Sequence, residues 1–253
     1  MRLSKKNNWE YNNVKFNKNT ILKFNKSNSW IYFIRNALVY KYAQTLEYLE
    51  LGCAPGICTA ALVHDSNWNI SGIDFSDKAD VFVETLAQVD KQVNLYKFDL
   101  LLDSLDKKFD VVASFGLIEH FSDESLDQIL QNHDHYLQSK GTLIIEVPNF
   151  NGFQYFWHKL FDSSDLKIHN LEIMSPIVIS EFYRKLGYEI TFCDYIGELH
   201  VWGSTAFNNK LFKLFAKLLA KSVNITSTIL NSGGFTIHGK NYSPAILLIA
   251  VKP

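Results

Sequence analysis

The stretch that most constrains this chain runs from Tyr48 to Leu62 and reads YLELGCAPGICTAAL. It begins as a short apolar run, passes through a segment that contains Gly52, Pro55 and Gly56, and continues as small residues with helical spacing. This order predicts a strand, a tight turn and the start of a helix. Glycines leave no side chain between the turn and a ligand, and a helix N-terminus offers unpaired amides. We therefore expect a small-molecule site at this turn.

Two phosphate-binding motifs fit the turn poorly. A dinucleotide fingerprint needs the pattern G-x-G-x-x-G, whereas this chain has Ala54 and Ile57 at two of the positions that this pattern tests. A phosphate-binding P-loop ends in Gly-Lys-Ser/Thr, and no such triplet follows Gly56. Neither motif accounts for the turn.

The segment ELGCAPG resembles the first motif of class I S-adenosylmethionine-dependent methyltransferases, in which an acidic and an apolar residue precede G-x-G-x-G. The chain has the acid, Glu50, and the two outer glycines, while Ala54 stands at the middle glycine. The segments LIEHF and IHNLEIMSP extend the resemblance to ubiquinone-biosynthesis-type and bacterial surface-polysaccharide methyltransferases, over about residues 46–253. The resemblance implies an α/β, Rossmann-like fold with a seven-stranded, mostly parallel sheet and an antiparallel last strand. It also implies S-adenosylmethionine as the cofactor.

The length and composition favour one domain. A chain of 253 residues with 47% hydrophobic and 14% aromatic content can bury one substantial core. We expect a single methyltransferase domain over residues 1–253, with an N-terminal segment and helix at 1–45. Two insertions, 149–172 and 198–241, interrupt the alternation of strands and helices and are expected to form a substrate lid.

Acidic residues follow the second and third predicted strands. Asp74 follows WNISGI at about the distance from the glycine turn at which a carboxylate meets ribose hydroxyls, although a turn-forming Asp has the same pattern. The resemblance implies that Asp99 meets the adenine amino group, with the amide of Leu100 beside the ring. It also implies that Ser114 to Gly116 lie near the methionine end. The other predicted cofactor-binding residues are Glu50, Gly52, Cys53, Ala54, Gly56 and Phe75.

Methyl transfer from a sulfonium mainly requires that the protein holds a nucleophile in line and removes its proton. A histidine suits an alcohol or phenol acceptor because its pKa is near neutral. His120 and His169 are the candidate catalytic residues, and packing or turn hydrogen bonds are the alternative roles. His158 and His200 lie in the insertions and are expected near the acceptor.

The remaining histidines and cysteines predict no metal centre. His133 and His135 fall on a helix that we expect to be exposed, and no spacing of His, Asp or Glu stands out as a ligand set. Cys53, Cys58 and Cys193 form no disulfide framework and no Cys-x-x-Cys pair. This cysteine usage favours the reducing cytoplasm.

The predicted function is O-methylation of a small molecule, with a sugar or nucleotide-activated surface-glycan precursor as the first choice of acceptor. N-methylation, a quinone-type phenol and a lipid-linked intermediate stay open. An alternative of another class is an accessory module that keeps a nucleotide pocket without catalysis. A net charge of −1 supplies no field that would attract nucleic acid.

The segment NKLFKLFAKLLAKS predicts a basic amphipathic helix. Such a helix can lie on an anionic membrane, but more often it covers its own core with the lysines facing water, and we prefer that interpretation. No apolar run approaches the roughly 18 residues that span a bilayer, so we expect a soluble protein. Aromatic side chains of the first insertion, such as Phe153 and Trp157, are assigned to the core rather than to an acceptor pocket.

Overall fold

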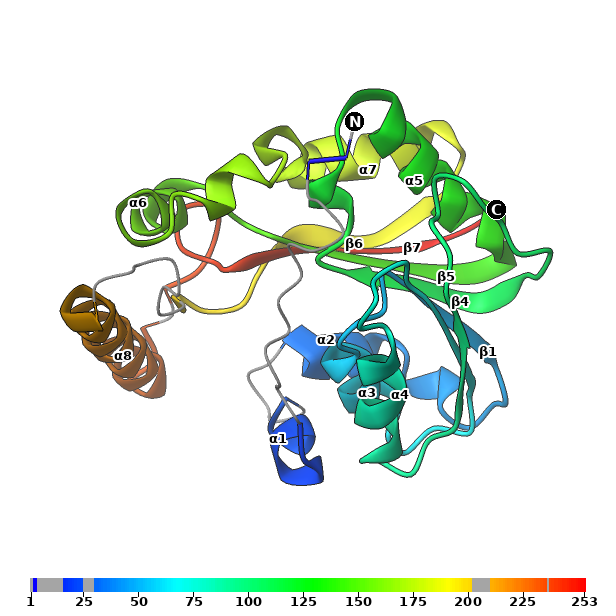
Figure 1. Cartoon of the computed structure of the whole chain (residues 1–253), viewed down its shortest axis with the longest axis horizontal. Coiled ribbons are helices and arrows are strands. Elements are labelled where there is room, and N and C mark those ends of the chain that lie inside the picture. Colours follow the sequence, from blue (N-terminus) through cyan, green and yellow to red (C-terminus); the bar gives the residue numbers. More distant parts are fainter. Residues whose placement is uncertain (1, 4–15, 25–29, 202–209, 236) are drawn as a thin grey trace.

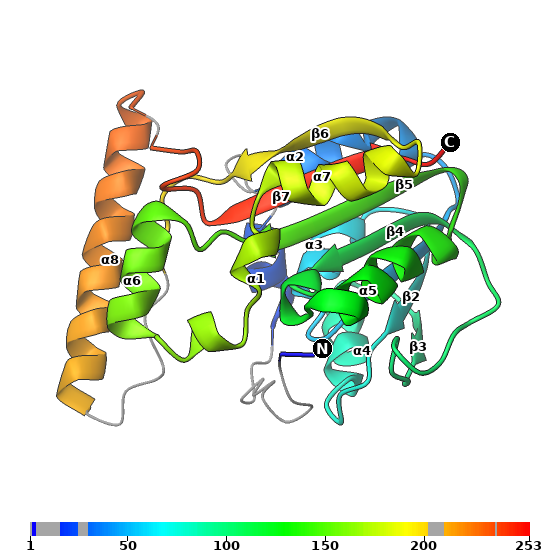
Figure 2. The same ribbon diagram turned by 90° about the horizontal axis from the view of Figure 1, so that it is seen from above.

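In the part of the chain that the structure describes, seven strands form one sheet in the order β3-β2-β1-β4-β5-β7-β6 (Figures 1 and 2). The computed structural model describes residues 2–3, 16–24, 30–201, 210–235 and 237–253, and for 210–212 it describes the backbone alone. The strands are β1 (Glu47–Leu51), β2 (Asn69–Ile73), β3 (Val93–Tyr96), β4 (Phe109–Phe115), β5 (Leu137–Pro148), β6 (Glu189–Ile196) and β7 (Ala245–Val251).

The strand directions confirm the predicted fold class. Strands β1 to β5 pair in parallel, and β7 pairs antiparallel with both β5 and β6. The expected antiparallel pair at the end of the chain is therefore present. Strand β5 begins at Leu137, before Lys140 and Gly141. Lys140 has φ 62°, so the chain bends there within the strand.

Helices cover both faces of the sheet (Figures 1 and 2). They are α1 (Lys18–Lys23), α2 (Trp30–Ala37), α3 (Ile57–Val63), α4 (Asp80–Ala87), α5 (Asp123–Tyr136), α6 (Gly152–Phe161), α7 (Pro176–Lys185) and α8 (Lys210–Ser232), with short 3-10 helices η2 (Val39–Lys41), η3 (Ile118–His120), η4 (Asp165–Lys167) and η5 (Leu171–Ile173). The helix expected within residues 1–45 corresponds to α2, which ends at Ala37 and is followed by η2.

Two hydrophobic cores lie on opposite faces of the sheet because successive side chains of a strand alternate in direction. In β1, Leu49 and Leu51 join the core beneath α5 and α7. Tyr48 from the same strand joins the core beneath α1 to α4. Both cores are fully covered at these positions, which fixes the strand register and so the place where each strand ends.

The two insertions, 149–172 and 198–241, together form a separate small core. Trp157 and Phe161 of α6 are buried against Ala216 and Ala220 of α8. The assignment of Trp157 to a core is therefore confirmed. Figures 1 and 2 show α8 beyond α6, at one end of the molecule.

The predicted orientation of the basic amphipathic helix is wrong. Large apolar residues of α8 are exposed, among them Phe215 at 55% and Leu218 at 56%, whereas Ala216 is fully buried. The helix thus packs through its small residues and turns its large apolar face outward. The side chains of Leu211 and Phe212, which the prediction also used, lie outside the described residues. Within the described chain, no helix is long and apolar enough to cross a membrane.

Candidate functional site

The glycine turn after β1 forms one wall of the candidate site. Gly52 and Gly56 have φ values of 66° and 80°, in the left-handed region that favours glycine. The amides of Gly52 and Cys53 both donate to the carbonyl of Ile73, at 2.8 and 3.2 Å, and so tie the turn to the end of β2. A Cβ on Gly52 would lie 2.7 Å from Leu117 Cδ1. The backbone conformation therefore favours glycine at position 52, and a larger residue would also have to displace the Leu117 side chain.

A pocket of about 340 Å³ opens at the carboxyl ends of the parallel strands. This is where open α/β sheets bind their ligands, and the volume falls in the range of small-molecule sites. Seven predicted cofactor residues line it: Gly52, Ala54, Asp74, Phe75, Asp99, Leu100 and Gly116.

Asp74 follows β2 and holds the turn in place. One carboxylate oxygen accepts from the amide of Ala54 at 3.1 Å, and the other accepts from the amide of Ser76 at 2.7 Å. Each carboxylate oxygen has a further lone pair. Asp74 can therefore serve the turn and also accept hydrogen bonds from the hydroxyls of a ligand, so the two roles weighed in the sequence are compatible.

Asp99 follows β3 and pairs with Arg2, a residue that the sequence analysis did not select. The guanidinium of Arg2 also lies over the ring of Phe75, at 4.1 Å from its centre. The amide of Leu3 donates to the carbonyl of His120 at 2.8 Å and so fastens Arg2 and Leu3 to η3. A planar group that donates to Asp99 would make the contact that the resemblance assigns to adenine.

Three further predicted cofactor residues lie behind the pocket wall. Glu50 is buried in β1, and this burial raises the pKa of Glu50 well above its usual range. Cys53 is fully buried against Gly72, where a Cβ would lie 2.6 Å from its Sγ. Gly56 is the N-cap of α3 and packs against Phe82. These residues support the turn but are not among those that line the pocket.

Ser114 is also buried, and the predicted exposure of His133 is wrong. His133 donates from Nδ1 to the carbonyl of Ile129 at 2.8 Å, and its Nε2 lies 2.9 Å from the Ser114 hydroxyl. Burial lowers the pKa of His133 to about 4, which keeps the ring neutral near pH 7. Its position one turn after Ile129 is the sequence signal that could have revealed this burial. His135 is exposed, as predicted.

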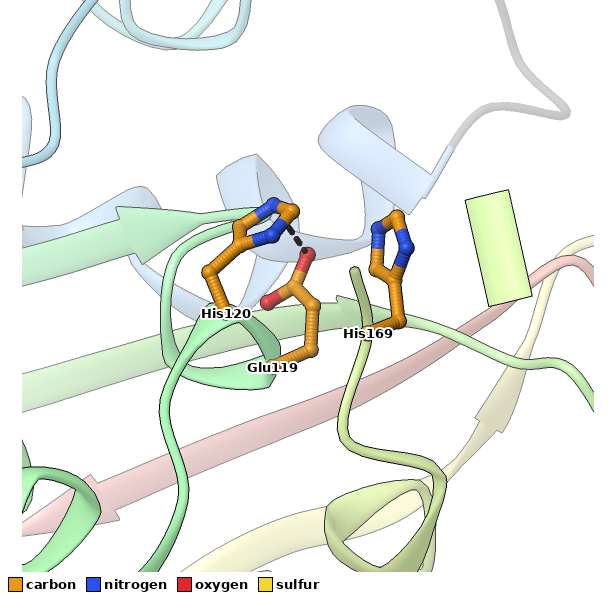
Figure 3. Close-up of side chains that lie close together, drawn as sticks. All are labelled: Glu119, His120 and His169. Carbon is orange, nitrogen blue, oxygen red and sulfur yellow. Dashed lines mark ion pairs between the residues drawn. The ribbon is translucent and has the colours of Figure 1, made fainter. Parts of the chain in front are cut away.

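The two candidate catalytic histidines lie in contact (Figure 3). The ring centres of His120 and His169 are 4.5 Å apart. Glu119, which precedes His120 in η3, completes a cluster whose three ligand-type atoms lie within 4.8 Å of one another. Its Oε1 lies 3.8 Å from His120 Nε2. Glu119 and His120 line the pocket, and His169 lies beside them.

Backbone hydrogen bonds hold this cluster together. His120 Nδ1 donates to the carbonyl of Ile168 at 3.1 Å, and His169 Nδ1 donates to the carbonyl of Asp165 at 2.6 Å. The amide of Asn170 donates to the carbonyl of Glu119 at 2.6 Å. The first insertion is thus fastened to η3 beside the pocket.

Other polar candidates differ in their distance from the pocket. Glu146 of β5 lines it, and burial raises the pKa of Glu146 to about 8. His158 packs on the ring of Phe150, with ring centres 4.1 Å apart, and lies near Asp165. His200 lines a separate groove beside α8. Glu119, Glu146 and Arg2 are charged pocket residues that were not predicted from the sequence; for Glu119 the signal was its place next to His120.

Residues 49–143 match a family model described as a methyltransferase domain. This match confirms the predicted enzyme class. It covers β1 to the start of β5, including the glycine turn and both strand-end aspartates. A comparison with curated proteins gave no match.

Solved structures with the same fold come from several bacteria and an archaeon. A magnesium protoporphyrin IX methyltransferase from Synechocystis PCC 6803 with bound S-adenosylhomocysteine has a TM-score of 0.58 at 14% identity, covering 88% of this chain and 82% of that one. The N-methyltransferase NodS from Bradyrhizobium japonicum WM9, in complex with S-adenosylhomocysteine, has a TM-score of 0.53 at 12% identity, covering 100% and 95%. A SAM-dependent methyltransferase from Archaeoglobus fulgidus has a TM-score of 0.53 at 17% identity, covering 91% and 98%.

The pocket residues fit S-adenosylmethionine, the cofactor expected from the sequence. Asp74 offers carboxylate oxygens for the ribose hydroxyls, and Phe75 offers a ring for the adenine. Asp99 can accept from the adenine amino group. Gly52 and Gly116 leave room at the turns, since both have positive φ and carry no side chain.

Proposed function

We propose that this chain transfers a methyl group from S-adenosylmethionine to an oxygen atom of a small molecule. The observation that carries the proposal is the convergence of Asp74, Asp99 and the Gly52 turn on one pocket inside the segment that matches a methyltransferase domain. The bound cofactor supplies a methyl group on a sulfonium, which is already electrophilic. The chain then has to bind the cofactor, orient the acceptor and exclude water.

Residues that follow different strands would bind different parts of the cofactor. Asp74 after β2 would hold the ribose, and Asp99 with the amide of Leu100 after β3 would hold the adenine edge. Phe75 would stack on the adenine once Arg2 has left its ring.

The acceptor would lie at the end of the pocket that Gly116, Glu119, His120 and Glu146 line. Carboxyl and imidazole groups there offer several hydrogen-bond partners for hydroxyls. A sugar, free or nucleotide-activated as in a surface-glycan precursor, carries several such hydroxyls, which supports it as the first acceptor class over a quinone-type phenol. We propose that His120 and His169 orient the reacting hydroxyl and take part in removing its proton.

The first experiment is calorimetric titration of the purified chain with S-adenosylhomocysteine, with NAD as the control. Saturable binding of S-adenosylhomocysteine alone supports the proposal. Mass spectrometry of reactions with nucleotide sugars, phenols and amines then identifies the acceptor class. If only amines are methylated, the protein is an N-methyltransferase and the O-methylation proposal is wrong. This outcome is worth testing because two similar proteins are named as N-methyltransferases.

Substitutions separate the binding and catalytic roles. His120→Ala and His169→Ala should retain S-adenosylhomocysteine binding and lose most of the turnover. Full activity in both variants would show that positioning by the rest of the pocket suffices. Failure of the wild-type chain to bind S-adenosylhomocysteine would favour the accessory-module alternative.

A further inference from the structure

The cluster of Glu119, His120 and His169 has a feature that catalysis by histidine alone does not need. Both histidines donate their Nδ1–H groups to backbone carbonyls, those of Ile168 and Asp165. A neutral imidazole with its proton on Nδ1 carries a lone pair on Nε2. Histidines that ligate metals are commonly oriented in this way, by a carbonyl that accepts from the second ring nitrogen.

The third group of the cluster is a buried carboxyl. Glu119 is 1% exposed, and its Oε2 has no hydrogen-bond partner among the described residues. In the described chain its ion-pair contact is with His120, at 3.8 Å, whereas Arg2 pairs with Asp99. A buried carboxylate is costly unless a cation or hydrogen-bond donors balance it. Figure 3 shows Glu119 and His120 side by side, with His169 facing them from the first insertion.

We propose that Glu119, His120 and His169 bind a divalent transition-metal ion at the acceptor end of the pocket. Two imidazole nitrogens and one carboxylate oxygen suit Zn²⁺, Mn²⁺ or Fe²⁺ better than Mg²⁺ or Ca²⁺, which prefer oxygen ligands. Ligand atoms around one such ion lie roughly 3 to 3.5 Å apart. The three groups, now within 4.8 Å, would close by about an ångström on binding.

The position of this site gives the metal a use. Three protein ligands leave coordination positions open, and both Glu119 and His120 line the pocket. A hydroxyl that binds at an open position would have a lowered pKa, so that its proton passes more readily to solvent. The two histidines would then take part in removing the proton as ligands of the ion rather than as bases. This use rests on the proposed function, while metal binding itself does not. The sequence analysis predicted no metal because η3 and the first insertion meet only in the folded chain.

The test is titration of the untagged, chelator-treated protein with Zn²⁺ by calorimetry and with Co²⁺ by visible absorption. We expect one saturable site per chain, with far weaker binding of Mg²⁺. Glu119→Gln and His169→Phe should each weaken Zn²⁺ binding at least tenfold. His169→Phe keeps an aromatic ring against His120 and Phe150. His135→Gln removes an exposed histidine and should bind as the wild type does.

Several results would overturn the metal site. Absence of a stoichiometric Zn²⁺ site in the wild type would do so, as would unchanged binding in His169→Phe. Circular dichroism of each variant guards against loss of fold, and His169→Phe decides if Glu119→Gln does not fold. Because the titration needs no methyl donor or acceptor, a negative result leaves the methyltransferase proposal standing.

A second, independent observation concerns the outward face of α8. The helix packs through small residues, with Ala216, Ala220 and Ser227 buried. Its larger apolar residues point the other way and are 36–63% exposed. This outer face consists of Leu214, Phe215, Leu218, Leu219, Ile225 and Ile229. Asn224 fixes the orientation, because its side-chain amide exchanges two 2.8 Å hydrogen bonds with the backbone of Val201.

The charge of α8 indicates what the outer face would meet. Lys213, Lys217 and Lys221 follow one another along one side of the helix, and α8 contains no Asp or Glu. The helix lies at one end of the molecule, beyond α6 (Figure 2). A helix with an apolar face flanked by lysines binds in the plane of an anionic lipid surface. We infer that the outer face of α8 docks the protein on such a surface.

Co-sedimentation of the full chain with vesicles tests this inference. We expect binding to phosphatidylcholine vesicles that contain phosphatidylglycerol, little binding to phosphatidylcholine alone, and weaker binding at high salt. Leu218→Glu combined with Ile225→Glu should abolish binding to the anionic vesicles. Lys217→Gln combined with Lys221→Gln should weaken this binding severalfold. Lys140→Gln combined with Lys185→Gln removes the same charge elsewhere and should leave vesicle binding unchanged.

Other outcomes contradict membrane docking. No binding to anionic vesicles, or binding that survives Leu218→Glu with Ile225→Glu, would overturn it. Size-exclusion chromatography distinguishes a protein partner: a stable dimer that these two substitutions split would assign the outer face to a second copy of the chain instead.

Discussion

The guanidinium of Arg2 lies 4.1 Å from the centre of the Phe75 ring and pairs with Asp99. Both contacts are ones that the proposed function assigns to adenine, so the cofactor has to displace Arg2. A partly exposed ion pair and a cation–π contact are each worth about 0.5–1 kcal/mol.

The first prediction follows from this competition. Arg2→Ala should bind S-adenosylhomocysteine about five- to thirtyfold more tightly than the wild type, because the two contacts together are worth about 1–2 kcal/mol and about 1.4 kcal/mol is a factor of ten. Isothermal calorimetry measures the change, and Arg2→Lys, which keeps the charge but loses the planar group, should fall between. Weaker binding in Arg2→Ala would mean that Arg2 contacts the cofactor.

Asp74 tests the ribose assignment. Asp74→Asn loses one acceptor oxygen in a buried position, which costs about 1–3 kcal/mol and should weaken S-adenosylhomocysteine binding roughly 10- to 100-fold. Asp77→Asn changes an exposed acid nearby and should bind normally. Equal affinities for the two variants would mean that Asp74 stabilises the turn and does not bind the cofactor.

His133 should make the fold sensitive to acid. Burial lowers the pKa of His133 to about 4, against about 6.5 in the unfolded chain, so the unfolded state gains a proton first as the pH falls. The stabilising contribution of the neutral ring is complete above about pH 6.5 and is lost towards pH 4. Between pH 6.5 and pH 5 this loss is about 2 kcal/mol.

Urea unfolding at pH 7 and at pH 5 measures that contribution. His133→Gln should show a smaller difference in unfolding free energy between the two pH values than the wild type does. His135→Gln, an exposed histidine on the same helix, should keep the wild-type difference. Identical pH dependence in all three proteins would contradict the prediction.

A comparison of Gly56 with Gly234 separates the cost of a steric clash from the cost of the backbone conformation. In Gly56→Ala the new Cβ would lie 2.5 Å from Phe82 Cδ2, at a φ of 80°. Gly234 has a similar φ of 86°, but no atom of the described residues lies within 4 Å of such a Cβ. Gly234→Ala should cost about 1–2 kcal/mol of unfolding free energy from the backbone alone, and Gly56→Ala clearly more. Equal losses in denaturant unfolding would show that the packing around Gly56 relaxes.

The sheet and the cofactor side of the pocket could be predicted because they depend on local pattern. Buried parallel strands read as continuous apolar runs, and the residue that follows each run lies at the carboxyl edge of the sheet. This placed Asp74 and Asp99 beside the Gly52 turn. It did not separate pocket-lining residues from those just behind, such as Cys53 and Ser114, because strand ends alternate between the two sides.

Features that depend on tertiary packing were missed. Apolar spacing in α8 indicated an amphipathic helix but not which face would pack, and the small residues Ala216 and Ala220 pack because they let α6 approach closely. The contact between His120 and His169 depends on the path of the first insertion. Arg2 stands in a segment without periodicity, so nothing in the sequence placed it at Phe75.

Strand β7 follows β6 in the chain yet lies between β5 and β6. A ribosome synthesises the chain from its N-terminus, so β5 and β6 leave the exit tunnel before their shared partner does. During that interval one edge of β5 has no neighbour, and β6 lacks the strand with which it pairs. Unpaired edges invite association with other chains. Closure of the sheet must therefore wait until Val251 has left the exit tunnel, and the edges of β5 and β6 are open to aggregation until then.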